Sequence, residues 1–188
     1  MIAARRWMVQ SANRFRLGQP RVPLATMREL PGSTIGVIGA SQIGRRVLRY
    51  LAPFRATVLL ADPYCSPEVA ADHGATLVDL PELLRRSDIV TLHAPVTPET
   101  MRMLGAAEFA AMRDGALFIN TARGTLVDPD ALLAELQTGR ISAVLDVTDP
   151  QEPLPPDSPF FALENCVVYP HIAAITVEAR QRQGAMTV

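Results

Sequence analysis

The chain has 188 residues, 48% of them hydrophobic and 20% charged, and a formal net charge of -1. A chain of this length buries one good core and hardly two, so we expect one globular domain. A pI near 6.3 leaves no basic surface for nucleic acid or membrane lipid, and a small molecule is the expected partner. No apolar run reaches the roughly 18 residues of a membrane span, and no signal peptide core follows the basic start. We therefore expect a cytoplasmic protein.

The first part of the chain predicts a βαβ unit. Residues 1–16 are rich in Ala, Arg and Met and predict a helix without a capping residue at its start. After a connector at 18–23, residues 34–38 (TIGVI) and 57–61 (TVLLA) are compact apolar runs typical of buried strands. Between these strands, apolar side chains recur at helical spacing, at Ile43, Val47, Leu51 and Phe54.

The alternation of strands and helices continues along the rest of the chain. Two helices carry start signals, at Asp79 and at Asp128 with Pro129 behind it. Because the strands are apolar throughout, they favour a parallel, doubly wound α/β sheet covered on both faces. The proline-rich stretch 150–159 is the one long irregular segment, and we expect it to shape a site. Further strands are expected at residues 75–78, 88–92, 116–120, 143–147 and 165–169.

The two cysteines, Cys65 and Cys166, lie far apart in the sequence, with no CxxC pair and no nearby cluster of histidines. This spacing argues against a disulfide framework and against a zinc site. We therefore expect both thiols to be reduced and no metal to be bound.

A glycine-containing turn, residues 39–44 (GASQIG), follows the first strand and opens a helix, as a dinucleotide loop does. Gly39 would make the tight turn, Gly44 would let helix and sheet pack closely, and the helix N-terminus would face a pyrophosphate. Ser41 stands where such loops have a middle glycine, and its hydroxyl can donate a hydrogen bond to phosphate instead. An ordinary strand-to-helix turn is the alternative interpretation.

Asp62 ends the second strand, eighteen residues after Gly44. A carboxylate at this place would accept hydrogen bonds from ribose hydroxyls and would repel a 2'-phosphate. The next residues, Pro63 and Tyr64, provide no arginine for such a phosphate, so we expect NAD rather than NADP. A turn-forming Asp-Pro pair is the alternative interpretation.

Two later segments, residues 92–100 (LHAPVTPET) and 120–128 (NTARGTLVD), closely resemble the D-isomer-specific 2-hydroxyacid dehydrogenases. The resemblance runs from about Gly36 to Arg180. It implies a Rossmann-type NAD-binding domain of an oxidoreductase that transfers hydride between NAD(H) and a 2-hydroxy or 2-keto acid. Further matching segments are 145–147 (LDV), 152–155 (EPLP), 157–159 (DSP) and 170–173 (PHIA).

The resemblance implies roles for four polar residues. Arg123 matches the arginine that binds the substrate carboxylate and polarises the keto oxygen, a bidentate task in which lysine should fail. His171 matches the acid-base histidine, and Glu152 the carboxylate that keeps its imidazole protonated near neutrality. Asp146 matches the residue that holds the nicotinamide carboxamide. The expected cofactor-binding set is Gly39, Ser41, Gln42, Ile43, Gly44, Asp62, His93, Ala94, Pro95, Thr121, Ala122, Arg123, Asp146 and His171.

The partner of His171 has alternatives. Relatives commonly place the carboxylate five residues after the aspartate, and Gln151 stands at that position here. We assign the role to Glu152 because Pro-Leu-Pro follows it as in the family. Gln151 and Asp149 are the other candidates, and a glutamine partner would resemble the formate dehydrogenases of the same superfamily.

Whole enzymes of this family place the active site between this domain and a substrate domain built mainly from an N-terminal part that is absent here. We expect residues 1–30 to be a remnant of the interdomain helix and connector, 31–175 the NAD-binding domain, and 176–188 the start of a truncated C-terminal helix. Such a chain should bind cofactor and turn over little, because water enters the open site. The family's dimers form largely through this domain, so a homodimer is expected.

Two other classes of protein fit parts of the sequence. A corepressor-like protein that responds to NAD(H) would retain the same residues without needing catalysis. An S-adenosylmethionine methyltransferase also uses a glycine turn and a carboxylate after the second strand, although it has no reason to carry the TARG and PHIA segments. The substrate is open among glyoxylate, hydroxypyruvate, lactate-type and phosphoglycerate-type acids.

Overall fold

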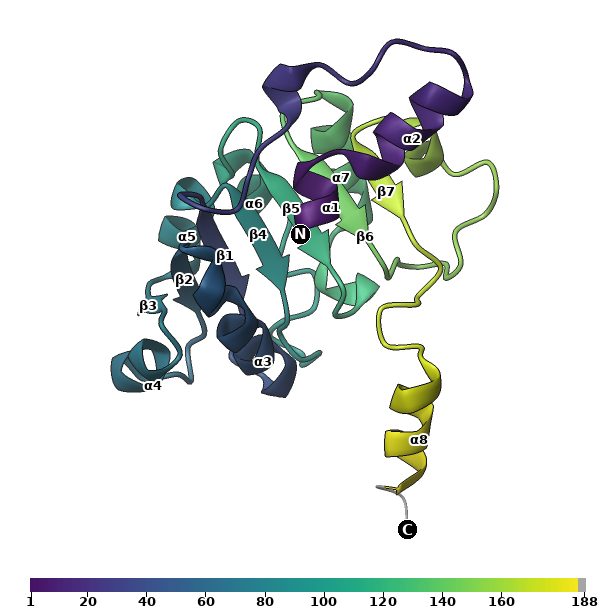
Figure 1. Ribbon diagram of the computed structural model, residues 1–188. Coiled ribbons are helices and arrows are strands. Elements are labelled where there is room, and N and C mark those ends of the chain that lie inside the picture. The colour runs from purple at the N-terminus through teal and green to yellow at the C-terminus, as the bar shows by residue number, and fades with distance from the viewer. Residues whose placement is uncertain (186–188) are drawn as a thin grey trace.

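The computed structural model describes residues 1–185 and builds them around one parallel sheet (Figure 1). Its strands are β1 Thr34–Ile38, β2 Thr57–Ala61, β3 Thr76–Leu77, β4 Ile89–Leu92, β5 Leu117–Asn120, β6 Ser142–Leu145 and β7 Cys166–Val168. Their order across the sheet is β3-β2-β1-β4-β5-β6-β7. The predicted doubly wound α/β sheet is confirmed: β1 and β2 have the predicted ends, and the ends of the other strands differ from the predicted ones by at most two residues. The order reverses between β1 and β4, where sheets of this kind bind ligands at the carboxyl ends of the strands.

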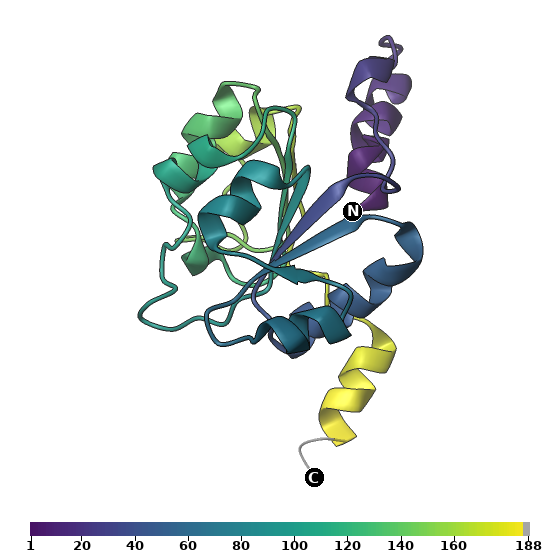
Figure 2. The same cartoon turned by 90° about the vertical axis from the view of Figure 1, so that its left-hand side faces the viewer.

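Helices connect the strands and flank the sheet on both sides (Figure 2). Along the chain they are α1 Ile2–Arg5, α2 Met8–Arg16, α3 Gln42–Leu51, α4 Pro67–Asp72, α5 Leu80–Arg86, α6 Ala106–Ala111, α7 Pro129–Gln137 and α8 Val177–Ala185. Short 3-10 turns lie at η1 Leu24–Thr26, η2 Ala52–Phe54, η3 Gly124–Leu126 and η4 Pro159–Ala162.

The sheet is buried on both faces because each strand sends alternate apolar side chains to opposite sides. In β1, Val37 belongs to the core that includes Leu48 of α3, whereas Ile38 belongs to the core that includes Leu83 of α5. The core that contains Ile38 also includes Phe109 of α6 and the leucines of α7. Burial on both sides explains why the strands read as continuous apolar runs in the sequence.

The predicted capping residues fix where two helices begin. Asp79 Oδ1 accepts a hydrogen bond of 2.6 Å from the backbone N–H of Glu82 at the start of α5. Asp128 Oδ1 accepts hydrogen bonds from the N–H groups of Asp130 and Ala131, at 3.0 and 3.1 Å, at the start of α7. A cap of this kind typically stabilises a helix by about 1 kcal/mol.

The two ends of the described chain differ in how they meet the sheet. The helix predicted over residues 1–16 is broken at Trp7, whose φ of 50° separates α1 from α2. Arg14 of α2 forms an ion pair with Glu164, in the loop before β7, and this pair joins the first segment to the far end of the sheet. At the other end, α8 extends away from the sheet (Figures 1 and 2), and Val177 at its start is 70% exposed.

Candidate functional site

The turn between β1 and α3 is packed so closely that two of its positions require glycine. Gly39 has φ +95°, and a Cβ added to it would lie 2.6 Å from the backbone nitrogen of Ala94. A Cβ on Gly44 would lie 2.1 Å from the carbonyl oxygen of Gly39. The turn therefore packs against both the first turn of α3 and the loop after β4, and neither position has room for a side chain.

Ser41 is the N-cap of α3. Its Oγ accepts a hydrogen bond of 3.2 Å from the N–H of Gly44, so the hydroxyl hydrogen stays available to a ligand. The first N–H groups of a helix have no acceptor within it. Among the hydrogen bonds of residues 1–185, the N–H groups of Gln42 and Ile43 have no acceptor. A hydroxyl and two N–H groups at a helix N-terminus suit a phosphate.

Asp62, at the end of β2, is tied to the same turn. Its Oδ2 accepts a hydrogen bond of 2.6 Å from the N–H of Ala40, and its Oδ1 accepts one of 2.8 Å from the N–H of Tyr64. Each carboxylate oxygen has a second lone pair. The side chain can therefore hold the turn in place and also accept hydrogen bonds from a ligand's hydroxyl groups.

Two adjoining hollows lie along the carboxyl ends of the strands. The Asp62 hollow, of about 400 Å³, lies between the β1–α3 turn and the segments after β2 and β4; its lining includes Gly39, Ser41, Arg45, Asp62, Cys65, Ala94 and Pro95. The His93 hollow, of about 420 Å³, is lined by Ser41, Ile43, His93, Ala94, Pro95, Val96, Thr121, Ala122 and Arg123. Both hollows share Ser41, Ala94 and Pro95, so they form one groove that crosses the point where the strand order reverses.

His93 is buried in the wall of the second hollow, with 7% of its surface exposed. Its Nε2 lies 3.0 Å from Thr91 Oγ1. Burial lowers the pKa of His93 to about 4, because an imidazolium would lose its hydration there. The ring is therefore neutral at pH 7, and it shapes the groove without adding charge.

Arg123 lies exposed just after β5, and residues that the sequence analysis did not single out hold its backbone. Asn120, 1% exposed, donates to the carbonyl oxygen of Arg123 at 2.9 Å and accepts from the N–H of Ala122 at 3.0 Å. A Cβ on Gly124 would lie 2.1 Å from the carbonyl oxygen of Thr148. An asparagine at the end of a predicted strand and a glycine directly after the arginine were the available sequence signals for these roles.

His171 follows β7, and its Nδ1 is hydrogen bonded to Glu152 Oε1. Of the three candidates for this partner, the structure therefore selects Glu152 over Gln151 and Asp149. Glu152 Oε2 also accepts a hydrogen bond of 3.2 Å from the N–H of Thr148. The proline-rich segment that carries Glu152 thus shapes this site, as its composition predicted. With Nδ1 engaged, Nε2 is the ring nitrogen left for proton exchange.

Asp146, directly after β6, holds the backbone that carries His171. The residue is 3% exposed, and its Oδ1 and Oδ2 accept hydrogen bonds from the N–H groups of Ile172 at 2.8 Å and Ala173 at 2.9 Å. This contact was not foreseen from the sequence. His171 itself has φ 54°, a left-handed conformation that costs energy outside glycine and needs such support.

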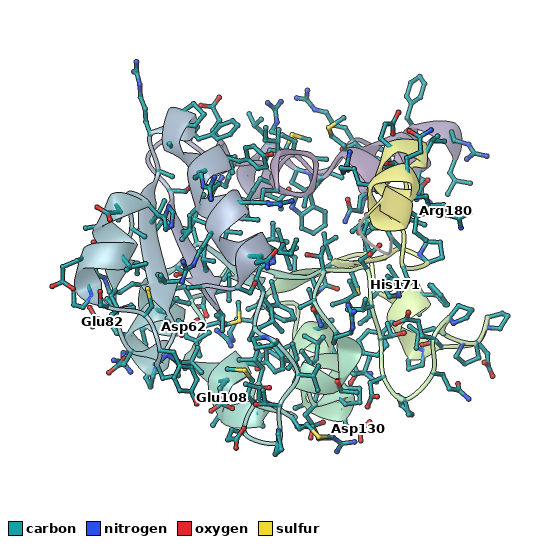
Figure 3. All side chains as sticks on the ribbon, turned by 90° about the horizontal axis from the view of Figure 1, so that it is seen from below. Asp62, Glu82, Glu108, Asp130, His171 and Arg180 are labelled. Carbon is teal, nitrogen blue, oxygen red and sulfur yellow. The ribbon has the colours of Figure 1, made fainter. Side chains whose placement is uncertain are left out.

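The view from below in Figure 3 places Asp62 on one side of this edge of the sheet and His171 on the other. The groove lies at the ends of β1 and β4, next to the glycine turn and to Asp62. Farther along the same edge, Arg123 follows β5 and His171 follows β7. A glycine turn at a helix N-terminus, a carboxylate after β2 and a groove across the switch point are the features of a dinucleotide-binding domain.

The sequence matches, over residues 1–173, the family described as D-isomer specific 2-hydroxyacid dehydrogenase, NAD binding domain. The chain belongs to this family and corresponds to its NAD-binding domain. The resemblance seen in residues 92–100 and 120–128, and the NAD cofactor that it implied, are thereby confirmed.

Relatives and solved structures agree with this assignment. The chain is 39% identical over 185 residues to a D-3-phosphoglycerate dehydrogenase of Archaeoglobus fulgidus, covering 98% of this chain and 35% of that protein. It is 37% identical over 191 residues to a glyoxylate reductase of Korarchaeum cryptofilum, covering 99% of this chain and 57% of that protein. A D-lactate dehydrogenase with NAD+ from Lactobacillus jensenii superposes with a TM-score of 0.86 at 29% identity, covering 98% of this chain and 59% of that one.

The chain thus spans between about a third and three fifths of these relatives' lengths. The relatives named above are dehydrogenases and a reductase, so the corepressor-like alternative gains no support from them, and the family match replaces the methyltransferase interpretation. Within residues 1–185, no cluster of three His, Cys, Asp or Glu side chains forms a possible metal site. None of the described helices is both long and apolar enough to cross a bilayer.

Proposed function

We propose that this chain is the cofactor-binding part of an NAD-dependent D-2-hydroxyacid dehydrogenase and also supplies its acid-base pair and its substrate-binding arginine. The observation that carries the proposal is the hydrogen bond between His171 Nδ1 and Glu152 Oε1, at the same edge of the sheet as Arg123 and the groove. A histidine oriented by a carboxylate is suited to proton exchange with an alcohol or a carbonyl oxygen.

The groove would hold a dinucleotide in one orientation, with the adenosine half near Asp62 and the nicotinamide half near Arg123. Asp62 would accept hydrogen bonds from the adenosine ribose in its hollow, and the start of α3 would hold the pyrophosphate near Ser41. The His93 hollow would take the nicotinamide half, which brings it next to Arg123. The cofactor set would be completed by Gly39, Gln42, Ile43, Gly44, Ala94, Pro95, Thr121, Ala122, Asp146 and His171.

When bound, NADH supplies the hydride that reduces a 2-keto acid. Arg123 would bind the substrate carboxylate and polarise the keto oxygen with its planar guanidinium. His171 would give the proton on Nε2 to that oxygen, and the carboxylate of Glu152 would compensate the charge of the imidazolium and fix the ring. In the reverse direction the same nitrogen accepts the hydroxyl proton.

Asp146 would serve this chemistry in two ways. By the resemblance it would bind the nicotinamide carboxamide. Through its hydrogen bonds to the N–H groups of Ile172 and Ala173 it would also position His171. In this chain Arg123 is exposed and the His171 side chain is 43% exposed, so water reaches both. We therefore expect the chain alone to bind cofactor with little turnover, since an open site loses the exclusion of water. Fast reduction of glyoxylate or pyruvate by the chain alone would contradict this.

A calorimetric titration with NADH beside NADPH tests the proposal directly. We expect saturable NADH binding and much weaker NADPH binding, because Asp62 repels a 2'-phosphate. Asp62→Asn should weaken NADH binding by about tenfold and narrow the preference for NADH over NADPH. Asp72→Asn, on the exposed end of α4, is the matched control and should change neither affinity. A wild-type chain that binds neither dinucleotide would refute the proposal.

We further propose a homodimer located in the cytoplasm. The family's dimers form through this domain, and the first segment exposes large apolar side chains: Phe15 by 85%, Leu17 by 72% and Leu24 by 72%. Residues 1–30 would belong to the interdomain helix and connector, 31–175 to the NAD-binding domain and 176–188 to the start of a returning helix, of which 186–188 lie outside the described residues. Sedimentation as a monomer at all concentrations would exclude the dimer, and cell fractionation would test the location.

A further inference from the structure

Arg45 lies at the groove, although the glycine-turn motif gives this position no role in binding. It is the fourth residue of α3, and it lines the Asp62 hollow. Helical side chains point back toward the helix N-terminus, so this one reaches toward the turn that precedes α3. Its Nε donates a hydrogen bond of 2.9 Å to the carbonyl oxygen of Ala40, which fixes the guanidinium over that turn.

The rest of the guanidinium is available to a ligand. Among the hydrogen bonds and ion pairs of residues 1–185, none involves Nη1 or Nη2 of Arg45. Four N–H bonds are therefore left to donate. Arginines elsewhere in the fold differ in this respect, since Arg14, Arg86, Arg113 and Arg140 all form ion pairs with carboxylates.

Positive charge is scarce along the groove. The sequence contains no lysine, and the basic side chains that line the two hollows are Arg45 in one and Arg123 in the other. Asp62 and Glu99 line the Asp62 hollow as well, so an anionic ligand there needs a cation close to it. A pyrophosphate carries two negative charges, and the N–H groups of a helix start offset only a part of them.

The position of Arg45 points to the middle of the groove. Ser41 is shared by both hollows, Arg45 lines one of them with it, and the guanidinium of Arg45 is hydrogen bonded to the residue just before Ser41. Ser41 also replaces the glycine that would let phosphate approach the backbone closely, and its Oγ takes the N–H of Gly44. A phosphate held farther from the backbone is within reach of a long side chain.

We propose that Arg45 binds the pyrophosphate of the dinucleotide and supplies the fixed positive charge for it in this groove. The inference rests on the proposed NAD(H) binding, and it adds a phosphate-binding residue on the helix that follows the turn. Charge-assisted hydrogen bonds from a guanidinium to phosphate are among the strong ones, so the loss of this side chain has a measurable effect.

The test compares Arg45→Met with Arg46→Met by calorimetry in the 188-residue chain. Arg46 is the next residue, exposed, and lines neither hollow, so it controls for a lost positive charge on α3. Arg45→Met should weaken NADH and ADP-ribose by about tenfold or more, and Arg46→Met by less than about twofold. The affinity for NADH should also depend less on salt in Arg45→Met than in the wild type, because one charge contact has been removed.

Adenosine, followed by NMR shift changes, distinguishes a phosphate contact from damage to the turn. It carries no phosphate, so Arg45→Met should leave its affinity unchanged; equal losses for adenosine and ADP-ribose would overturn the proposal in favour of a purely structural bond to Ala40. A loss for NADPH alone would assign Arg45 to a 2'-phosphate and would also overturn it. If the wild type binds NADH and Arg45→Met binds it equally well, only this inference is overturned. If the wild type does not bind NADH, the proposed function is overturned.

Discussion

Asp146 Oδ1 accepts a hydrogen bond of 2.8 Å from the backbone N–H of Ile172 and so ties the end of β6 to the residue after the expected acid-base histidine. The next N–H, of Ala173, is bonded to the other carboxylate oxygen. Asp146 is 3% exposed, and water cannot easily replace its carboxylate as an acceptor for these N–H groups. Asp146 therefore controls the conformation of the segment on which His171 sits.

Replacing Asp146 by Asn should loosen that segment. The amide keeps one acceptor oxygen and turns a donor toward the second N–H, so about 1–3 kcal/mol of stability should be lost. Hydrogen exchange should speed up at Ile172 and Ala173, while the amides of β1 keep their protection. The control is Asp149→Asn. This residue lies nearby, and its side chain forms none of the hydrogen bonds found within residues 1–185. Unchanged exchange at both amides would contradict the positioning role.

The buried His93 should make stability fall with acid. Its folded pKa is about 4 against 6.5 for a free imidazole, so between these values the unfolded chain binds a proton that the folded chain does not. This group therefore leaves stability unchanged well above pH 6.5, and stability decreases as the pH falls through 6.5 to 4, by about 3 kcal/mol in total. The measurement is urea unfolding at several pH values for wild type, His93→Asn and, as control, His73→Asn. If the free energy of unfolding depends on pH in the same way in the wild type and in His93→Asn, this linkage is excluded.

An alanine at position 44 should damage the fold around the turn. The new Cβ would meet the carbonyl oxygen of Gly39 at 2.1 Å, and that atom belongs to backbone that is itself held against Ala94. We expect Gly44→Ala to cost about 1–3 kcal/mol, as overpacking does, and to abolish NADH binding. Gly105→Ala is the matched substitution, because its Cβ finds no atom closer than 3.5 Å and should leave binding intact. Normal NADH affinity in Gly44→Ala would show that the close contact is not needed.

The two cysteines should report on cofactor binding. Cys65 lines the Asp62 hollow, whereas burial raises the pKa of the Cys166 thiol to about 12. Since the thiolate is the reactive form, iodoacetamide should modify Cys65 much faster than Cys166. NADH should slow the modification of Cys65 by covering it, and mass spectrometry would follow both sites. Equal rates with and without saturating NADH would place the cofactor away from the Asp62 hollow.

Much of the fold could be predicted from the sequence because local patterns determine it. Apolar runs such as residues 34–38 identified the strands, and Asp128 followed by Pro129 identified a helix start, as the structure confirms. The break at Trp7 could not be predicted, because it depends on a left-handed backbone conformation that no glycine or asparagine announces.

The site was less accessible to sequence reasoning, since several of its contacts join residues far apart in the chain. The segment with Glu152 was recognised, but the choice among three partners for His171 needed the structure. No motif marks Arg45, because its place at the groove follows from the helix, which brings its own fourth residue back to the turn before it. The second task of Asp146 depends on the pairing of β6 with β7, which sequence alone does not show.

The contact between Gly39 and Ala94 has a consequence for how quickly a ligand is captured. The turn after β1 and the loop after β4 touch so closely that neither can shift alone, and the crevice between them is assembled before any ligand arrives. A preorganised crevice orders few residues on binding, which lowers the entropic cost of association. Association with NADH should therefore be a single step whose observed rate rises linearly with cofactor concentration, without the plateau that a slow loop closure would impose.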